Sequence, residues 1–451
     1  MLLCGRSGCG KTTLTRLING LIPQFFAGDL SGEVLLDRKN IFDMPMQLIA
    51  EKVGSVFQNP RTQFFNVDSD GEIAFGLENK AVPSETMKKR VADTAKDLNI
   101  QNLLGRSIFS LSGGEKQKIA FASVYAADPD IYVLDEPSSN LDAASCFDLN
   151  EHLKFVKSKG KTIVIAEHRL YYLTDTVDRI IYLNNGCIEC DWTASQFKKL
   201  SLEQRRNMGL RTTNLNEEAP VCVCENRKEN AFEIKNAALS YRSRIVLQNI
   251  NLSAAKGEVI AVVGPNGAGK TTFSRAICGL HKESEGSYFF KGKQLGAKQR
   301  MKISYMVMQD VNYQLFAESV ADECTFGLKH PDKALAEATL ANLGIEQLAS
   351  RHPNTLSGGQ KQRLAAAVSV VCGKDILVFD EPTSGLDYDS MVRLSAVIRS
   401  LSAMGKIIFI VTHDYEFTCC TCSRAIGIAD GSIQYDLPIE DAFIKKLFYV
   451  R

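Results

Sequence analysis

The segment Val259-Ile-Ala-Val-Val-Gly-Pro-Asn-Gly-Ala-Gly-Lys-Thr271 joins an apolar run to a glycine-rich loop, and it decides the fold. The apolar run predicts a buried strand, and Thr272-Phe-Ser-Arg275 after the loop predicts the start of a helix. Glycines in such a loop let backbone N–H groups surround a phosphate, and the dipole of the following helix favours the negative charge. Lys270 would reach the phosphate oxygens and Thr271 would ligate Mg²⁺, so the sequence predicts a phosphate-binding loop in an α/β protein.

The chain contains a second phosphate loop near its start, Gly5-Arg-Ser-Gly-Cys-Gly-Lys-Thr12. Three later landmarks also occur twice. Each pair is separated by 245 residues: Ser112 and Ser357 in a Ser-Gly-Gly segment, Asp135 and Asp380 in Asp-Glu-Pro, and His168 and His413. Because independent landmarks share one register, the chain is predicted to be an internal duplication.

The spacing of the two copies changes towards their front. Gln58 pairs with Gln309 at a separation of 251 residues, and Lys11 pairs with Lys270 at 259. The first copy therefore carries a few extra residues between its phosphate loop and its Ser-Gly-Gly segment. We place these extra residues in the loop Phe25–Ser31.

The duplication divides the 451 residues into a first domain over 1–210, a polar linker over 211–230 and a second domain over 231–451. Short apolar runs alternate with helical stretches, which predicts a mostly parallel sheet with crossover helices in each domain. Lys+Arg 53 and Asp+Glu 52 leave a formal charge of +1, so no nucleic acid is expected as a partner. No run of 18 apolar residues and no signal peptide are found, so the chain is expected to have no membrane span of its own.

The 13 cysteines are an odd number and follow no secretion signal, which indicates free thiols in a reducing compartment. A zinc site is the alternative for two groups, Cys187-Ile-Glu-Cys190 with Cys222-Val-Cys224, and Cys419-Cys-Thr-Cys422. Neither group has a histidine or a second CxxC at the spacing of a zinc finger. We therefore favour small buried side chains over a metal site.

An acidic pair ends one apolar run in each copy: Asp135-Glu136 and Asp380-Glu381. The aspartate would emerge at the carboxyl edge of the sheet beside the phosphate loop and hold Mg²⁺ through water. The glutamate that follows could polarise the attacking water as a general base. A lone acidic pair would be a solvated strand end, but beside a phosphate loop the catalytic interpretation is favoured.

Two segments, Leu111-Ser-Gly-Gly-Glu-Lys-Gln117 and Leu356-Ser-Gly-Gly-Gln-Lys-Gln-Arg363, resemble the signature motif of ATP-binding-cassette (ABC) ATPases. This motif separates that family from other phosphate-loop NTPases. By the same resemblance, Gln58 and Gln309 match the Q-loop, His168 and His413 the switch histidine, and Ser139–Asp142 and Ser384–Asp387 the D-loop. The resemblance implies two tandem phosphate-loop ABC nucleotide-binding domains, each with a mostly parallel sheet, an antiparallel β subdomain and a helical signature subdomain.

The resemblance also implies the role of each site residue. Catalysis would fall to Glu136, Glu381, His168 and His413. In the first copy ATP would contact Gly5, Ser7, Gly8, Cys9, Gly10, Lys11, Thr12, Thr13, Gln58, Ser112, Gly113, Gly114 and Asp135. In the second copy it would contact Tyr241, Gly264, Asn266, Gly267, Ala268, Gly269, Lys270, Thr271, Thr272, Gln309, Ser357, Gly358, Gly359 and Asp380. Mg²⁺ would accompany ATP on Thr12, Gln58, Asp135, Thr271, Gln309 and Asp380.

In the family two cassettes pair head to tail, so the signature segment of each copy would complete the ATP site of the other. A serine hydroxyl and glycine N–H groups at a helix start form a second anion site, which would make the γ-phosphate a link between the copies. Hydrolysis would remove that link and open the pair.

The first copy is short at its front. Family members stack adenine on an aromatic residue ahead of the phosphate loop, and Tyr241 fits that role in the second copy. The second copy extends from about Phe232 to Lys270, whereas the first has only Met1 to Gly10 ahead of Lys11. The adenine platform and the edge strands would occupy the part that is missing. We expect an incomplete gene model or a late start codon rather than a real loss of the first domain's front.

Several segments of the first copy resemble the fused double ATPases of energy-coupling-factor (ECF) importers: Ile18–Pro23, Phe57–Pro60 and Ala166–Arg169. This resemblance implies an ATPase at the cytoplasmic face of the cell membrane that powers uptake of a vitamin or of cobalt or nickel ions. Its implied partners are integral membrane subunits, a T-type coupling protein and a substrate-capture protein.

Aromatic residues follow both Q-loops in the same register: Gln63-Phe-Phe65 matches Gln314-Leu-Phe316, Glu72 matches Glu323, and Phe75-Gly76 matches Phe326-Gly327. Aromatic groups with one acidic side chain would suit a groove for a basic or apolar helix of a membrane partner. The alternative is aromatic side chains in the core with a solvated glutamate.

Two other functional classes compete with transport. A soluble double-cassette mechanical ATPase that acts on ribosomes would carry a long charged helical linker, whereas the polar stretch here is short. A regulatory pseudo-ATPase is disfavoured because Glu136 and Glu381 are both present.

Overall fold

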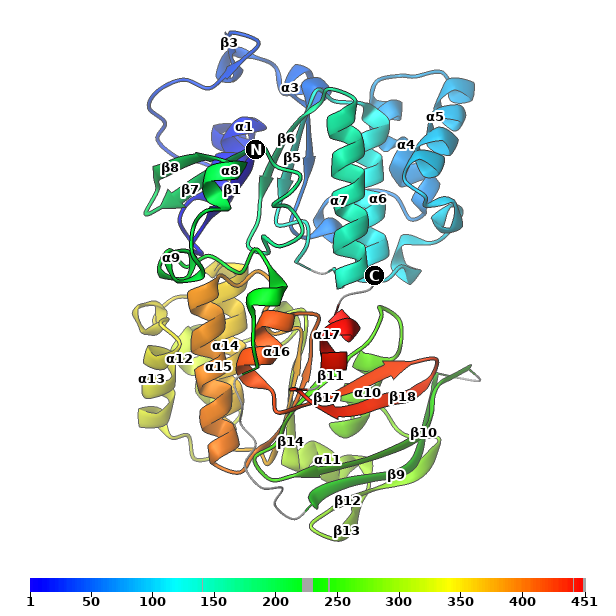
Figure 1. Cartoon of the computed structure of the whole chain (residues 1–451), viewed down its shortest axis with the longest axis vertical. Coiled ribbons are helices and arrows are strands. Elements are labelled where there is room, and N and C mark those ends of the chain that lie inside the picture. The colour runs from blue at the N-terminus through cyan, green and yellow to red at the C-terminus, as the bar shows by residue number, and fades with distance from the viewer. Residues whose placement is uncertain (140, 221–229, 242–243, 441, 449–451) are drawn as a thin grey trace. The chain divides into compact units, whose positions relative to one another are not determined.

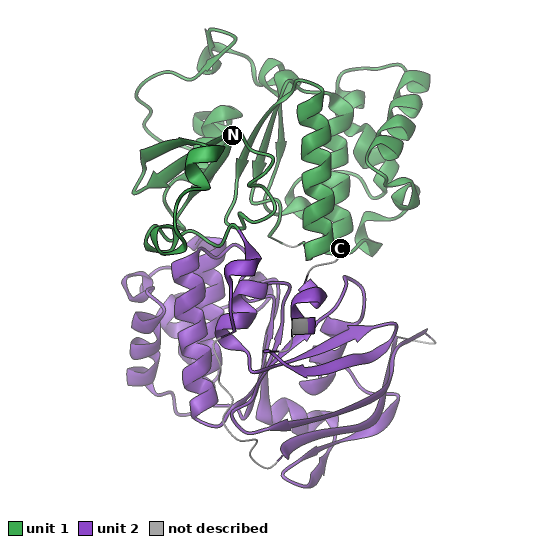
Figure 2. Cartoon of the chain, viewed as in Figure 1, with its two compact units in different colours: residues 1–213 green, residues 214–451 purple. Residues whose placement is uncertain are grey.

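The computed structural model describes residues 1–139, 141–220, 230–241, 244–440 and 442–448. They form two compact units, 1–213 and 214–451 (Figures 1 and 2). Within the described ranges no helix is both long enough and apolar enough to cross a membrane. Residues 221–229 of the predicted linker, which include Cys222 and Cys224, lie outside these ranges. The described cysteines are free thiols, of which Cys419 and Cys422 are buried and Cys187 is exposed.

The first unit is built around a six-stranded sheet in the order β4-β5-β6-β1-β7-β8. Its strands are β1 (Leu2–Gly5), β4 (Val53–Val56), β5 (Ile131–Asp135), β6 (Thr162–Ala166), β7 (Arg179–Asn184) and β8 (Cys187–Thr193). All neighbours are parallel except β7 and β8. The carboxyl ends of β1, β5 and β6 therefore meet at one edge of the sheet, which is where ligands bind in open α/β sheets.

The second unit repeats this sheet strand for strand, in the order β14-β15-β16-β11-β17-β18. Its strands are β11 (Val259–Val263), β14 (Ser304–Val307), β15 (Ile376–Asp380), β16 (Ile407–Val411), β17 (Arg424–Ala429) and β18 (Ser432–Pro438). An antiparallel sheet, in the order β10-β9-β12-β13, contains β9 (Asn230–Tyr241), β10 (Arg244–Ala255), β12 (Glu285–Phe290) and β13 (Lys293–Leu295). In the first unit, the hairpin that corresponds to β12 and β13 consists of β2 (Leu35–Leu36) and β3 (Lys39–Asn40). The predicted α/β class, with a mostly parallel sheet in each unit, is confirmed.

Helices cover the sheets. Those of the first unit are α1 (Lys11–Ile18), α2 (Leu21–Gln24), α3 (Met46–Lys52), α4 (Ser69–Asn79), α5 (Ser84–Asp97), α6 (Gly113–Ala127), α7 (Ala143–Ser158), α8 (Ala194–Phe197) and α9 (Leu202–Asn207). Those of the second are α10 (Lys270–Ile277), α11 (Ala297–Ile303), α12 (Val320–Thr325), α13 (Lys333–Asn342), α14 (Gly358–Val371), α15 (Tyr388–Ala403), α16 (Tyr415–Thr421) and α17 (Ala442–Phe448).

Alternate residues of the central strand β1 belong to different cores. Leu3 packs in a cluster that includes residues of α1 and α3, whereas Leu2 and Cys4 pack in a larger cluster that includes residues of α6 and α7. This alternation is the period of two expected for a strand covered on both faces. The apolar run Met1–Cys4 thus holds the phosphate loop on a rigid, doubly buried strand.

A turn shows where the two copies differ in length. Asp37-Arg38 and Lys291-Gly292 have positive φ angles in sequence-matched hairpin turns. From the first residue of α1 or α10 (Lys11 or Lys270) to the turn (Asp37 or Lys291), the first copy is five residues longer than the second. From the turn to the start of α3 or α11, the first copy is longer by three further residues, at the 3₁₀ helix Ile41–Asp43. The prediction of a single insertion within Phe25–Ser31 is therefore only partly right.

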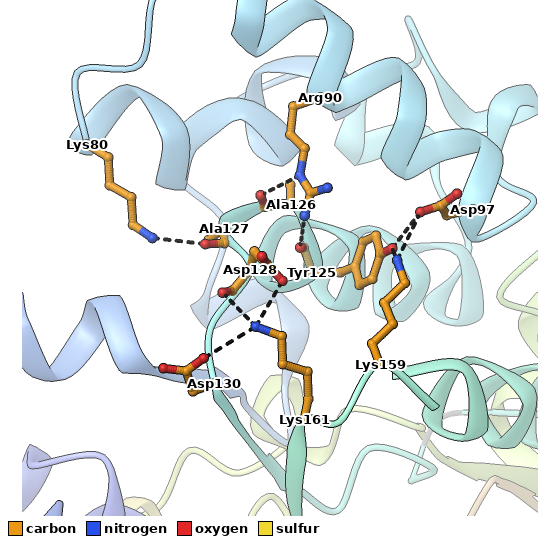
Figure 3. A network of polar contacts seen from close by, with 10 residues as sticks. All are labelled: Lys80, Arg90, Asp97, Tyr125, Ala126, Ala127, Asp128, Asp130, Lys159 and Lys161. Carbon is orange, nitrogen blue, oxygen red and sulfur yellow. Dashed lines mark hydrogen bonds and ion pairs between the residues drawn. The ribbon is translucent and has the colours of Figure 1, made fainter. Parts of the chain in front are cut away.

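The carboxyl end of α6 in the first unit is held by two cations from neighbouring helices (Figure 3). Lys80 donates to the carbonyl oxygen of Ala127 at 2.9 Å. Arg90 donates to those of Ala126 and Tyr125 at 3.0 and 3.1 Å. These bonds satisfy carbonyl groups that have no partner within the helix, and the positive charges favour the negative end of its dipole.

A second set of contacts joins α5 to the turn after α7 through Tyr125 (Figure 3). The Tyr125 hydroxyl donates to Asp97 at 2.5 Å, and Lys159 contacts both side chains. The positions 245 residues later hold Asn342, Val370 and Met404. The two units therefore differ in the side chains available to join these helices to one another.

Candidate functional site

Both glycine-rich loops adopt the same backbone at the carboxyl edge of their sheets. Gly5 and Gly264 have φ angles of 146° and 147°, and a Cβ on either would lie 2.1 Å from a carbonyl oxygen of the adjacent strand. Gly8 and Gly267 have φ angles of 80° and 83°, with open space where a Cβ would lie. Side chains rarely tolerate such conformations, so glycine at these positions shapes the loop and leaves it open to a ligand.

The two loop lysines lie over their own loops. Lys11 Nζ donates to the carbonyl oxygens of Gly5 and Arg6, both at 3.1 Å. Lys270 Nζ donates to those of Gly264 and Pro265, at 2.7 and 2.9 Å. Both side chains are buried. Each ammonium group thus lies against its own glycine-rich loop, where a phosphate bound by the loop would be within its reach.

A threonine and an aspartate meet beside each loop. Thr12 Oγ1 donates to Asp135 at 3.2 Å, and Thr271 Oγ1 donates to Asp380 at 3.1 Å. Burial and then the nearby charge of Glu136 raise the pKa of Asp135 to about 6, and burial raises the pKa of Asp380. A hydroxyl and a carboxylate that lack bulk solvent are donors that suit Mg²⁺, and a cation there would favour the ionised carboxylate.

The predicted general bases contact the predicted switch histidines. His168 Nε2 lies 3.5 Å from Glu136 Oε1, and His413 Nε2 lies 3.4 Å from Glu381 Oε1. Each glutamate adopts a left-handed backbone, with φ of 46° and 51°. Its amide donates to the last residue of the next strand, Ala166 at 2.8 Å or Val411 at 2.9 Å. In both units the glutamate carboxylate and the histidine imidazole therefore lie side by side at the edge of the sheet.

Both Q-loop glutamines form hydrogen bonds within their own units. Gln58 Nε2 donates to Glu136 Oε2 at 2.7 Å, while the carbonyl oxygen of Gln309 accepts from Gln362 at 3.2 Å. In the first unit a cavity of about 380 Å³ lies between α1 and the Q-loop. Its lining includes all three residues predicted to hold Mg²⁺ there, Thr12, Gln58 and Asp135.

The Ser-Gly-Gly segments begin the helices α6 and α14. Ser112 Oγ accepts from Glu115 N at 3.3 Å, and Ser357 Oγ accepts from Gln360 N at 3.4 Å. In return the Glu115 and Gln360 side chains accept from the backbone amides of the two serines, so each helix starts with a capping box. The glycines after each serine are the first residues of their helices, which leaves their N–H groups at the positive end of the helix dipole.

The remaining predicted residues lie in or next to these elements. Ser7, Cys9 and Gly10 precede α1, and Asn266, Ala268 and Gly269 precede α10. Thr13 and Thr272 belong to the first turns of these helices. Tyr241 ends β9, is 47% exposed, and has its ring 4.6 Å from that of His281. In the predicted D-loops, Asp142 and Asp387 cap α7 and α15, and Asn140 lies outside the described residues.

Two charged residues beside His168 were missed by the sequence reasoning. Glu167 and Arg169 are only 2% and 7% exposed. The signal was a carboxylate and a guanidinium directly after the buried strand β6, where the second copy has Thr412 and Asp414.

A glycine loop with a Thr–Asp pair and a Glu–His pair at the edge of a parallel sheet defines a phosphate-loop NTPase, and here the arrangement occurs twice. Residues 1–139 and 247–384 match the family model described as ABC transporter. The chain belongs to this family and carries tandem ABC ATPase domains, a class that binds ATP, generally with Mg²⁺, and hydrolyses it.

The relatives share this class. The chain is 51% identical over 444 residues to a protein of Treponema denticola named as an ABC transporter ATP-binding protein, covering 97% of this chain and 91% of the relative. It is 30% identical over 467 residues to an HMP/thiamine import ATP-binding protein of Bacillus subtilis, covering 97% and 85%. A solved structure titled as ribosome-bound archaeal Pelota and ABCE1 shares the fold, with a TM-score of 0.71 and 23% identity over 99% of this chain and 76% of that one.

Proposed function

We propose that this chain is the ATP-hydrolysing subunit of an ECF-type importer, with ATPase domains over residues 1–210 and 231–451. It would act at the cytoplasmic face of the membrane and power uptake of a vitamin or of cobalt or nickel ions through separate membrane subunits. The observation that carries the proposal is that both units hold a Thr–Asp pair and a Glu–His pair, as two working ATPases require. The relative named for HMP/thiamine import supports a vitamin-like cargo.

Each site residue has a proposed role in hydrolysis. Lys11 and Lys270 would turn from their loop carbonyl oxygens to the phosphates of ATP. The N–H groups of the loops would donate to the same phosphates. The Thr–Asp pairs, with Gln58 and Gln309, would hold Mg²⁺, which neutralises phosphate charge. Glu136 and Glu381 would accept a proton from the attacking water. The imidazoles of His168 and His413 would keep these carboxylates in place.

Two of the aromatic side chains expected to contact a partner are exposed, whereas the acidic side chains are not. Phe65 and Phe316 are 73% and 70% exposed, and the ring of Phe65 stacks on Phe75 at 4.8 Å. Glu72 and Glu323 are buried, and each accepts two backbone N–H bonds of 2.7 to 2.9 Å from the aromatic segment. The expectation that these glutamates offer a charge to a partner, or are solvated, is therefore wrong.

This geometry supports an apolar partner. Each glutamate fixes the loop from which an exposed phenylalanine projects, so the ring is presented by a rigid backbone. We propose that Phe65 and Phe316 contact an apolar helix of the membrane coupling subunit, because such rings contribute a large contact area at low entropic cost.

Hydrolysis is tested with single and double glutamine variants. Glu136→Gln and Glu381→Gln together should abolish turnover and leave ATP bound, whereas the exposed Glu151→Gln should leave turnover unchanged. Undiminished turnover in the double variant would refute the general-base assignment.

The transport role is tested by co-purification. Phe65→Ser with Phe316→Ser should keep the ATPase activity of the isolated subunit and lose its association with membranes. Association of the wild-type protein with ribosomes in place of membranes would favour the soluble mechanical class instead. The likeness to the ABCE1 structure does not favour that class, because at 23% identity it shows the fold alone.

A further inference from the structure

The first unit contains a buried polar cluster that joins the segments after β5 and β6. The carboxylate of Glu167 accepts four hydrogen bonds. Its Oε1 accepts from the amides of His168 at 2.7 Å and Arg169 at 3.1 Å. Its Oε2 accepts from the amide of Ser138 at 3.3 Å and from the Tyr172 hydroxyl at 2.9 Å. Ser138 follows Glu136 by two residues, so one carboxylate connects the two chain segments that carry the general base and its histidine.

Arg169 strengthens the same connection from the other side. Its Nη1 donates to the carbonyl oxygens of Ser138 at 3.3 Å and Leu141 at 2.9 Å. Leu141 directly precedes Asp142, the N-cap of α7. Ser138 and Leu141, which both lie between Glu136 and α7, are therefore bonded by Glu167 and Arg169, both charged and both excluded from solvent.

The second unit has a different arrangement at the same positions. The residues 245 positions after Glu167, Arg169 and Tyr172 are Thr412, Asp414 and Phe417. Thr412 Oγ1 accepts from the amide of Asp414 at 3.0 Å, and Asp414 Oδ1 accepts from the amide of Phe417 at 3.1 Å. These bonds connect residues within the segment after β16.

The backbone amides of the two histidines bond to different carboxylates. In the second unit the amide of His413 donates to Glu381 itself, at 3.4 Å. In the first unit the amide of His168 donates to Glu167, and Glu136 accepts from Gln58. Each carboxylate nevertheless lies at a similar distance from the histidine of its own unit.

We propose that Glu167 and Arg169 are positioning residues for hydrolysis in the first cassette, and that they make its catalytic geometry independent of the arrangement used in the second. Because they fix the segments that carry Glu136 and His168, they act on the chemical step and not on nucleotide binding. The inference rests on the proposed roles of Glu136 and His168.

The test exchanges the cluster for the residues of the other cassette. In the full chain with Glu381→Gln, which leaves the first site to turn over, Glu167→Thr, Arg169→Asp and Tyr172→Phe are introduced together. We expect kcat for ATP to fall about ten-fold or more while KM changes less than about two-fold, because a small misplacement of a catalytic group slows chemistry more than binding. Glu167→Gln, which keeps an oxygen acceptor, should recover part of the loss.

Several outcomes separate the possible explanations. A kcat within about two-fold of the parent would overturn the proposal, as would a rise in KM that accounts for the whole effect. If the triple exchange lowers the thermal midpoint, Tyr172→Phe alone replaces it, since this change removes one bond to Glu167 and copies the buried Phe417. Turnover that persists when Glu136→Gln is added to the Glu381→Gln background would instead refute the proposed function.

Discussion

Asp135→Asn should stabilise the metal-free protein at neutral pH, although it removes a predicted ligand of Mg²⁺. Asp135 is 8% exposed and accepts a hydrogen bond from Thr12. Burial and the charge of Glu136 raise its pKa from 3.8 to about 6. Asparagine keeps an oxygen acceptor for the Thr12 hydroxyl and carries no charge, so the variant removes the buried charge with little change in shape.

The size of the effect follows from proton linkage. The pKa of this acid is raised on folding, so the folded state binds the proton more tightly and the free energy of unfolding falls as the pH rises from about 4 to about 7. A pKa difference of about 2 corresponds to about 3 kcal/mol. Because the asparagine side chain does not titrate, the stability advantage of Asp135→Asn should grow by about 1.5 kcal/mol between pH 5 and pH 7.5.

The assay is urea unfolding in EDTA without nucleotide at these two pH values. The single tryptophan, Trp192, packs against Tyr182 and Phe197, so its fluorescence reports the first unit. The exposed Asp130→Asn, which also replaces a carboxylate by an amide, is the matched control. A stability difference for Asp135→Asn that is the same at both pH values, or a loss of stability at pH 7.5, would refute the reasoning.

Gly264→Ala should destabilise the protein by about 3 kcal/mol in urea unfolding, because its Cβ would meet a carbonyl oxygen at 2.1 Å. Gly267→Ala, where a Cβ has space, should cost about 1 kcal/mol. Equal costs would contradict this explanation. Glu323→Gln should lower the unfolding free energy by about 1 to 3 kcal/mol, since it weakens two bonds of 2.7 Å to backbone amides, and an unchanged value would show that the carboxylate charge is unimportant. Lys159→Met combined with Asp97→Asn introduces the residues found at the matching positions of the second unit. The double variant should speed amide exchange at the end of α6 while changing stability by about 1 kcal/mol or less. Unchanged exchange would show that the contacts of these residues with Tyr125 do not hold the end of α6.

Much of the site could be predicted because its signals are local in the sequence. The glycine pattern before Lys11 and Lys270 dictates the loop backbone, and an acidic pair after an apolar run places Asp135 and Asp380 at the sheet edge. The shared register of the two copies supported the assignment of His168 and His413, whereas the contact of His168 with Glu136, between residues that follow neighbouring parallel strands, is seen only in the structure.

The features that were not predicted depend on contacts between distant residues. Glu72 follows an aromatic segment, as a solvated residue would, yet it is buried because two amides of that segment converge on it. The cluster around Glu167 needs Ser138 and Tyr172 at once, and no spacing rule indicates their convergence. The eight extra residues of the first copy between Lys11 and Gln58 are divided by a hairpin turn, whereas the sequence shift alone reports their total.

The position of Lys11 on its own loop has a consequence for nucleotide affinity. The ammonium group acts as an internal competitor, because it must leave two carbonyl oxygens before it can contact a phosphate. The same two bonds hold the loop in shape without a ligand, so less conformational entropy is lost when one binds. Since the competing partners are neutral carbonyls, salt weakens the attraction of the lysine to phosphate more than its attraction to the loop. Rising ionic strength should therefore shift the lysine back towards its own backbone and weaken binding of a triphosphate.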